Sequence, residues 1–170
     1  MHIVKANKVE IFNSLRFRFK MDYQEAINKI ERFINYQDRS EFEIKQKLKC
    51  IEAPITFHQK IIDELKENGS INDERFAKNF TQGKFRFKNW GRIKIKYALR
   101  KKFVQGDIID KSMNVISEED YLQKIEVVYQ AKRKDFGEVL SFEDKAKISR
   151  HLQSKGFEME FIMNQLQNAR

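Results

Sequence analysis

Apolar residues recur along much of the chain at the three- or four-residue spacing of amphipathic helices. The first such stretch follows Asp22 and places Tyr23, Ile27, Ile30 and Ile34 on one face. With one proline and six glycines in 170 residues, the chain has far fewer turn residues than an all-β protein of this size needs. The pattern therefore predicts an all-α fold.

Capping and breaking residues mark the helix boundaries in the first part of the chain. Ser40 opens a capping-box motif, Ser-x-x-Glu, and this motif predicts the start of a second helix. Pro54 separates that helix from a third one, and the pair Asn68-Gly69 predicts where the third helix ends. Residues 22–70 are thus expected to contain three helices.

The same three-helix pattern is then repeated twice. The middle helices of the three sets align without gaps at residues 40–48, 91–99 and 144–152. Their apolar positions correspond at periods of 51 and 53 residues, and the matched positions are Ile44, Ile95 and Ile148, followed by Leu48, Leu99 and Leu152. Because sequence identity between the sets is low, the repeat is inferred from pattern and spacing.

We therefore predict tandem three-helix repeats, about nine helices in total, at residues 22–70, 71–115 and 116–170. A repeat of this size has a small core, so its neighbours should cover its remaining apolar edge. The expected result is an elongated body, straight or curved, and a single globule of nine helices is the alternative. Residues 1–21 are expected to form a basic N-terminal arm or a short extra element, because basic and aromatic residues alternate near their end.

The positive charge of the chain is concentrated in one stretch. The net charge is +9, and Arg75 to Lys102 holds eleven Lys or Arg residues and no Asp or Glu. The rest of the chain has 23 basic and 25 acidic residues. Such a segment favours an anionic partner, which is nucleic acid, an anionic membrane or an acidic protein. Phe85, Phe87 and Trp90 alternate with its cations and could stack on unpaired bases, although core packing is the commoner role of such rings.

The cations of this stretch are the candidate contacts with nucleic acid. In a helix from residue 91 to residue 102, Arg92, Lys96 and Arg100 share a face, where their mutual repulsion would be relieved by a polyanion. A merely solvated helix is one alternative, and a helix-turn-helix that binds double-stranded DNA is another. Few side chains here suit base-edge readout, so we expect phosphate contacts without strong sequence specificity. The predicted contacts are Lys84, Arg86, Lys88, Arg92, Lys94, Lys96, Arg100 and Lys101.

The sequence lacks recognisable catalytic, metal and cofactor motifs. His2, His58 and His151 are far apart, and the single cysteine, Cys50, excludes an internal disulfide and is expected to pack in the core. There is no phosphate-binding loop, dinucleotide-binding fingerprint or nucleophile elbow. We therefore expect a binding protein without metal or cofactor, not an enzyme. Because the chain also has no signal-like or membrane-spanning stretch, we expect it in the cytoplasm.

Several short motifs resemble the RecX family, whose members regulate the recombinase RecA. In the first repeat the motif is RSEFE at 39–43, and in the second repeat it is INDERFA at 71–77, followed by Trp-Gly at 90–91. The third repeat resembles the family less, through Lys-Gly-Phe at 155–157. The chain differs from the family at Arg92, where proline is frequent, and at 81–84, where the family has an Arg-rich run.

This resemblance covers about residues 22–170 and carries expectations about function. It implies a non-enzymatic protein of tandem three-helix modules that lies along the groove of a RecA–single-stranded DNA filament. There it would inhibit the recombinase by blocking filament extension or by promoting disassembly. The implied partners are RecA and single-stranded DNA, with double-stranded DNA as a further candidate, and a monomer is expected. The rival hypothesis is a helical DNA-binding protein that acts alone.

Overall fold

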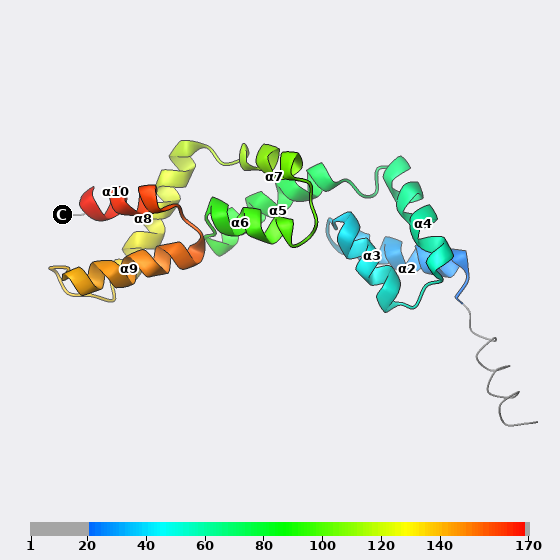
Figure 1. Ribbon diagram of the computed structural model, residues 1–170, viewed down its shortest axis with the longest axis horizontal. Coiled ribbons are helices and arrows are strands. Elements are labelled where there is room, and N and C mark those ends of the chain that lie inside the picture. Colours follow the sequence, from blue (N-terminus) through cyan, green and yellow to red (C-terminus); the bar gives the residue numbers. More distant parts are fainter. Residues whose placement is uncertain (1–20, 169–170) are drawn as a thin grey trace, which may run out of the picture. The chain divides into compact units, whose positions relative to one another are not determined.

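The structure is a computed structural model that describes residues 21–168, and this part of the chain contains helices and no β-strand (Figure 1). The boundary between its two compact units falls after Ile71. The predicted all-α class is therefore confirmed, whereas the predicted N-terminal arm lies outside the described residues apart from Met21. The nine helices of the described part are α2 (Tyr23–Tyr36), α3 (Glu41–Cys50), α4 (Ile55–Glu67), α5 (Asp73–Lys88), α6 (Arg92–Arg100), α7 (Gly106–Met113), α8 (Glu118–Arg133), α9 (Phe142–Lys155) and α10 (Met159–Asn168).

The first unit contains α2, α3 and α4, whose apolar faces form one core. Ile44 and Leu48 of α3 have no exposed surface in this core. The helix begins with the predicted capping box. The Ser40 hydroxyl accepts a hydrogen bond from the Glu43 amide, and the Glu43 carboxylate accepts one from the Ser40 amide. Two of the amides at the start of α3 are thereby satisfied by side chains.

The ends of α3 and α4 show one wrong prediction and one confirmed prediction. Cys50, which was expected in the core, is exposed. It lies two positions after the buried Leu48, and two positions along a helix turn a side chain to the opposite face. The end of α4 is as predicted, because Asn68 is its C-cap and Gly69 has a φ of 71°. That left-handed conformation costs little for a residue without Cβ.

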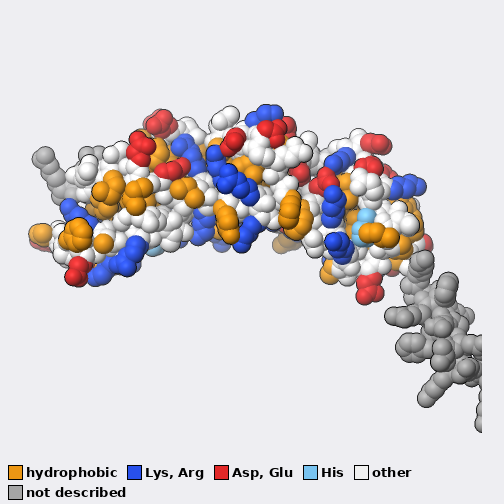
Figure 2. All heavy atoms as spheres, viewed as in Figure 1, with side chains coloured by type: hydrophobic (Ala, Val, Ile, Leu, Met, Phe, Trp, Pro, Cys, Tyr) orange, Lys and Arg blue, Asp and Glu red, His pale blue; other side chains and the backbone are white. Residues whose placement is uncertain are grey.

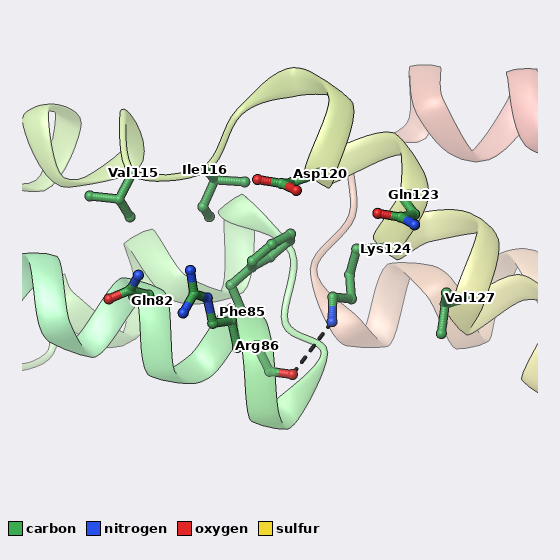
Figure 3. A pocket seen from close by; sticks show the side chains of 9 residues that line it. All are labelled: Gln82, Phe85, Arg86, Val115, Ile116, Asp120, Gln123, Lys124 and Val127. Carbon is green, nitrogen blue, oxygen red and sulfur yellow. Dashed lines mark hydrogen bonds between the residues drawn. The ribbon is translucent and has the colours of Figure 1, made fainter.

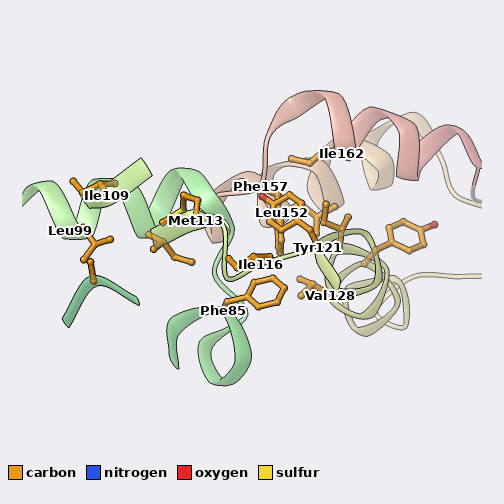
Figure 4. Packing of buried hydrophobic residues seen from close by; sticks show 14 of the residues in the cluster. Phe85, Leu99, Ile109, Met113, Ile116, Tyr121, Val128, Leu152, Phe157 and Ile162 are labelled. Atoms are coloured by element: carbon orange, nitrogen blue, oxygen red, sulfur yellow. The ribbon is translucent and has the colours of Figure 1, made fainter. Parts of the chain in front are cut away.

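The second unit contains α5 to α10, which share one continuous core (Figure 4). Ile95 and Leu99 of α6 have no exposed surface, and neither do Ile148 and Leu152 of α9. These residues are the counterparts of the buried isoleucine and leucine of α3, so the register predicted from the repeat is confirmed. Helices α5 to α7 and α8 to α10 thus correspond to the second and third repeats, whose outer boundaries stay a prediction.

Aromatic side chains join these two repeats. The ring of Tyr121 in α8 is fully buried and lies 6.1 Å from the ring of Phe85 in α5 and 5.6 Å from that of Phe157, between ring centroids. The Tyr121 hydroxyl donates a hydrogen bond to the Glu158 carboxylate. Burial, together with that bond, raises the pKa of Tyr121 above its ordinary value. The hydroxyl is therefore a neutral donor inside the shared core.

The described part has neither a helix suited to span a membrane nor a cluster suited to bind a metal ion. None of the helices between residues 21 and 168 combines the length and the apolar content of a membrane span. Within the same range, no three His, Cys, Asp or Glu side chains are grouped so that they could hold a metal ion.

Candidate nucleic-acid interface

The eight predicted cations lie on α5, on α6 and at the end of α6. Helix α5 ends at Lys88, where Asn89 adopts a left-handed conformation with φ 53°, and α6 begins after Gly91. The turn between them is short, so both helices present their cations on the same three-helix repeat. Figure 2 shows Lys and Arg side chains gathered over the part of the second unit that α5 and α6 build.

Four of the predicted cations are exposed. Arg86 and Lys88 are in the last turn of α5, and Arg100 and Lys101 are at the end of α6. The Lys101 ammonium lies 4.7 Å from the centroid of the Tyr97 ring, which is itself 56% exposed. These four side chains form the group that solvent, and hence an anionic ligand, can reach most easily.

Lys84 occupies a different environment. Its ammonium lies 5.1 Å from the centroid of the Phe80 ring and 5.3 Å from that of the Trp90 ring, and the residue is half-buried. Trp90 also has the Lys94 ammonium 5.1 Å from its centroid. Cations near two ring faces in this way hold the α5–α6 turn in place.

Arg92 and Lys94 contact the third repeat. The Arg92 guanidinium lies 4.0 Å from the centroid of the Tyr121 ring. The Lys94 ammonium donates a hydrogen bond of 2.8 Å to the main-chain carbonyl of Ser154. Both side chains are half-buried. They therefore connect two repeats, and an external ligand would have to compete with these contacts.

Lys96 has an acidic partner on another helix. Its ammonium lies 2.8 Å from the Asp110 carboxylate of α7. The hydrogen bond from Lys96, with its positive charge, holds the pKa of Asp110 below its usual value. The like-charge repulsion expected along α6 is therefore partly offset, by a residue that lies outside the stretch from Arg75 to Lys102.

The N-terminus of α6 is closed to ligands by the third repeat. The Gly91 amide donates to the Lys155 carbonyl at 2.8 Å, and the Ile93 amide donates to the Gly156 carbonyl at 3.1 Å. The Arg92 amide donates to the Tyr121 hydroxyl at 3.2 Å. Free amides at a helix N-terminus are a common phosphate site, but these three already have acceptors.

The aromatic residues of the stretch divide in a similar way. Phe85 is buried in the core and Trp90 is half-buried beside Lys84, so both pack. Phe87, between two exposed cations, is 81% exposed. Of the three rings considered as base-stacking candidates, Phe87 is therefore the one that solvent reaches.

The structure adds one cation that the sequence pattern did not identify. The Lys124 ammonium of α8 lies 5.3 Å from the centroid of the Phe85 ring and donates a hydrogen bond of 3.4 Å to the main-chain carbonyl of Arg86. Lys124 belongs to the third repeat and lies 38 residues from Arg86. No local spacing could have paired them.

Comparisons with known proteins agree with this architecture. Residues 72–113 match the family model for the second three-helix domain of RecX, and residues 118–164 match the model for its third three-helix domain. A crystal structure of RecX from Lactobacillus salivarius superposes with a TM-score of 0.77 at 20% identity, over 86% of this chain and 96% of that one. This likeness shows that the fold is shared.

Sequence relatives carry the name Regulatory protein RecX. The protein of that name from Clostridium acetobutylicum is 31% identical over 158 residues, which are 91% of this chain and 72% of that protein. The one from Lactococcus lactis subsp. cremoris strain MG1363 is 32% identical over 103 residues, which are 58% of this chain and 38% of that protein. This chain thus spans well under two thirds of some of the relatives that it matches.

Proposed function

The chain belongs to the RecX family, and from this premise we propose that it regulates RecA by binding the RecA–single-stranded DNA filament. The observation that carries the proposal is its 31% identity, over 91% of its length, to a protein named Regulatory protein RecX. Under this proposal the protein is a monomer, is located in the cytoplasm, and acts by binding without catalytic activity of its own.

The proposed effect is inhibition of the recombinase, by blocking filament extension or by promoting disassembly. The exposed cations Arg86, Lys88, Arg100 and Lys101 support contact with an anionic surface, because they reach solvent and have no carboxylate partner within 4 Å among the described residues. Lys84, Arg92, Lys94 and Lys96 are assigned a supporting role, since each contacts another part of the second unit.

A second candidate is a helical protein that binds DNA phosphates alone, without strong sequence specificity. The absence of acidic residues from Arg75 to Lys102 favours it as much as it favours the RecA proposal. The two candidates predict different effects on RecA filaments. A protein that only coats DNA inhibits RecA no more than its occupancy of free DNA explains, whereas a filament regulator acts on filaments that are already formed.

The test measures DNA-dependent ATP hydrolysis by RecA, on growing and on pre-formed filaments. The variant is Lys88→Glu/Arg100→Glu/Lys101→Glu, which reverses three exposed charges without touching the contacts between repeats. The matched control is Lys134→Glu/Lys145→Glu/Arg150→Glu, which makes the same charge change at exposed positions of the third repeat.

We expect the wild-type chain and the control to inhibit hydrolysis and the α5–α6 variant to inhibit much less. The affinity for single-stranded DNA should also depend less on salt in that variant. The slope of the logarithm of the binding constant against the logarithm of salt concentration should decrease in magnitude by about 0.7 for each phosphate that the variant no longer neutralises. If wild type leaves both kinds of filament unaffected, the RecA proposal is wrong. If the α5–α6 variant inhibits as well as wild type at every salt concentration, the cations have been assigned incorrectly.

A further inference from the structure

A pocket of about 190 Å³ lies between α5 and α8, where the second repeat packs on the third (Figure 3). Val115 and Val127 form apolar walls, and Phe85 borders it from the core side. The volume equals that of roughly six water molecules and is below the roughly 300 Å³ at which sites for drug-sized ligands begin. The pocket is therefore sized for one ring or one side chain.

The uncharged and acidic polar side chains of the pocket have no partners among the described residues. Gln82 of α5 and Gln123 and Asp120 of α8 all border the pocket, and their side chains make no hydrogen bond or ion pair in that part of the chain. The two amides can both donate and accept, whereas the ionised carboxylate can only accept. Asp120 and Gln123 are exposed and Gln82 is half-buried, so all three can bond to a ligand that enters from solvent, whereas an aliphatic side chain would make no hydrogen bond with any of them. A nucleobase has apolar faces and a hydrogen-bonding edge, so it matches both kinds of wall.

Two cations flank the same pocket from opposite helices. Arg86 of α5 is exposed and has no ion pair within the described residues. The Lys124 ammonium of α8 lies over the Phe85 ring and makes one long hydrogen bond, 3.4 Å to the Arg86 carbonyl, drawn as the dashed line in Figure 3. Such a bond is weak, so the ammonium can turn to another acceptor at low cost. A guanidinium and an ammonium that both border the pocket suit a phosphate group beside the bound ring.

We propose that this pocket accepts one unpaired nucleobase of bound single-stranded DNA, with Arg86 and Lys124 on the neighbouring phosphate. The proposal rests on the proposed function, because it assumes that the ligand of the second unit is single-stranded DNA. Asp120 only accepts hydrogen bonds, and carboxylates pair with the exocyclic amino group of cytosine. Cytosine is thus preferred over thymine at this position. This preference applies only to the base in the pocket, and the other contacts with the strand do not depend on its sequence.

The experiment measures binding of the full chain to three single strands of equal length by fluorescence anisotropy at one salt concentration. One strand is oligo(dC), one is oligo(dT) and one is abasic throughout, so the number of phosphates is constant. We expect the wild-type chain to bind oligo(dC) at least about fivefold more tightly than the abasic strand, since one base contact contributes that much.

Val127→Trp places a large ring in the lining of the pocket and should reduce the difference between oligo(dC) and the abasic strand to the part that stacking on the exposed Phe87 contributes. Val139→Trp is the matched control, because Val139 is 89% exposed and does not border the pocket. Asp120→Asn is a second variant at an exposed residue. It should reduce the preference for oligo(dC) over oligo(dT) while the affinity for the abasic strand stays unchanged.

Two results would overturn the proposal. The first is equal affinity of wild type for the abasic strand and for oligo(dC), or no binding of either. The second is a Val127→Trp chain that keeps the full difference between these strands. If that chain also no longer inhibits RecA, the pocket is assigned to a segment of a protein partner. Inhibition of RecA by the wild-type chain is measured in a separate assay that does not use oligo(dC), oligo(dT) or the abasic strand. The proposed function can therefore hold even if the pocket proposal fails.

Discussion

The backbones of Gly91 and Gly156 touch, and their contact joins the second repeat to the third. A Cβ atom on Gly91 would lie 2.2 Å from the Gly156 carbonyl oxygen. A Cβ atom on Gly156 would lie 2.3 Å from the Cβ of Lys94, and the φ of Gly156 is 90°. Neither position has room for a side chain, because the neighbouring atoms belong to the backbone or lie close to it.

Gly91→Ala should therefore destabilise the second unit. The Cβ would have to displace the main chain at Gly156, and overpacking of this kind costs about 3 kcal/mol of the free energy of unfolding. The measurement is urea unfolding followed by far-ultraviolet circular dichroism.

Gly83→Ala is the matched control for this substitution. Gly83 lies inside α5, and a Cβ there would meet nothing within 4 Å. Alanine should raise the free energy of unfolding by about 1 kcal/mol, because glycine is the poorer helix former. Equal midpoints for Gly91→Ala and wild type would contradict the close contact with Gly156.

Lys94 and Lys88 have the same side chain and should respond differently to methionine. Lys94→Met keeps the apolar stem against Gly156 but loses the hydrogen bond to the Ser154 carbonyl, at a cost of about 1 kcal/mol. Lys88 is exposed at the end of α5, so Lys88→Met should change stability by less than about 0.5 kcal/mol.

The order of the two substitutions should be reversed when DNA binding is measured in place of stability. Under the proposed function, Lys88→Met weakens the affinity for single-stranded DNA more than Lys94→Met does. Anisotropy titrations at a temperature where both variants are fully folded compare them directly. A Lys94→Met chain that is as stable as wild type and binds DNA worse than Lys88→Met would reverse both assignments.

The sequence predicted the helices and their register because the information is local. Ile44, Ile95 and Ile148 were matched by spacing alone, and all three are fully buried in the structure. The spacing of apolar residues within one repeat is enough to identify the face of each helix that is buried, without information from the other repeats. The capping box at Ser40 was predictable for the same reason, since both of its hydrogen bonds span three residues.

Most of the division of the cations could not be predicted, because the partners of Arg92, Lys94 and Lys96 come from distant parts of the chain. Lys94 finds its acceptor, Ser154, 60 residues away, and Lys96 finds Asp110 on the next helix. The local pattern shows eight equivalent charges, and tertiary packing makes four of them structural. Lys124 was not identified for the converse reason, since it lies in a helix without an excess of positive charge.

A buried pair of hydroxyl groups links α5 to α7. The Ser112 hydroxyl donates to the Ile109 carbonyl at 2.7 Å, so the Thr81 hydroxyl, 3.1 Å away, is the donor between the two. Both residues are buried. Ser112→Ala leaves the Thr81 hydroxyl without its acceptor and should cost about 1–2 kcal/mol.

Adding Thr81→Val to Ser112→Ala should recover part of that loss, because the unsatisfied donor is removed together with its partner. Urea unfolding of wild type, both single variants and the double variant closes a thermodynamic cycle. A double variant less stable than Ser112→Ala alone would mean that the Thr81 hydroxyl has another acceptor.

Glu41, the first residue of α3, gives the first unit a pH-dependent contribution to stability. Its carboxylate lies 2.5 Å from the Lys45 ammonium and 2.6 Å from the Lys66 ammonium of α4. The hydrogen bonds from Lys45 and then Lys66 lower the pKa of Glu41 below its ordinary value. A carboxyl group with a lowered pKa in the folded state stabilises that state above the pKa of the unfolded chain, about 4.3, and loses this effect as the pH falls through the folded pKa.

Glu41→Gln should therefore lower the free energy of unfolding at pH 7 by about 0.5–1 kcal/mol, the range for partly exposed ion pairs. The difference from wild type should shrink as the pH falls below about 4 and should also shrink in high salt. Urea unfolding across this pH range measures it, with Glu31→Gln as the control, because Glu31 is exposed and has no ion pair within the described residues. A constant difference between Glu41→Gln and wild type from pH 7 to pH 3 would show that the two lysines do not stabilise the ionised carboxylate.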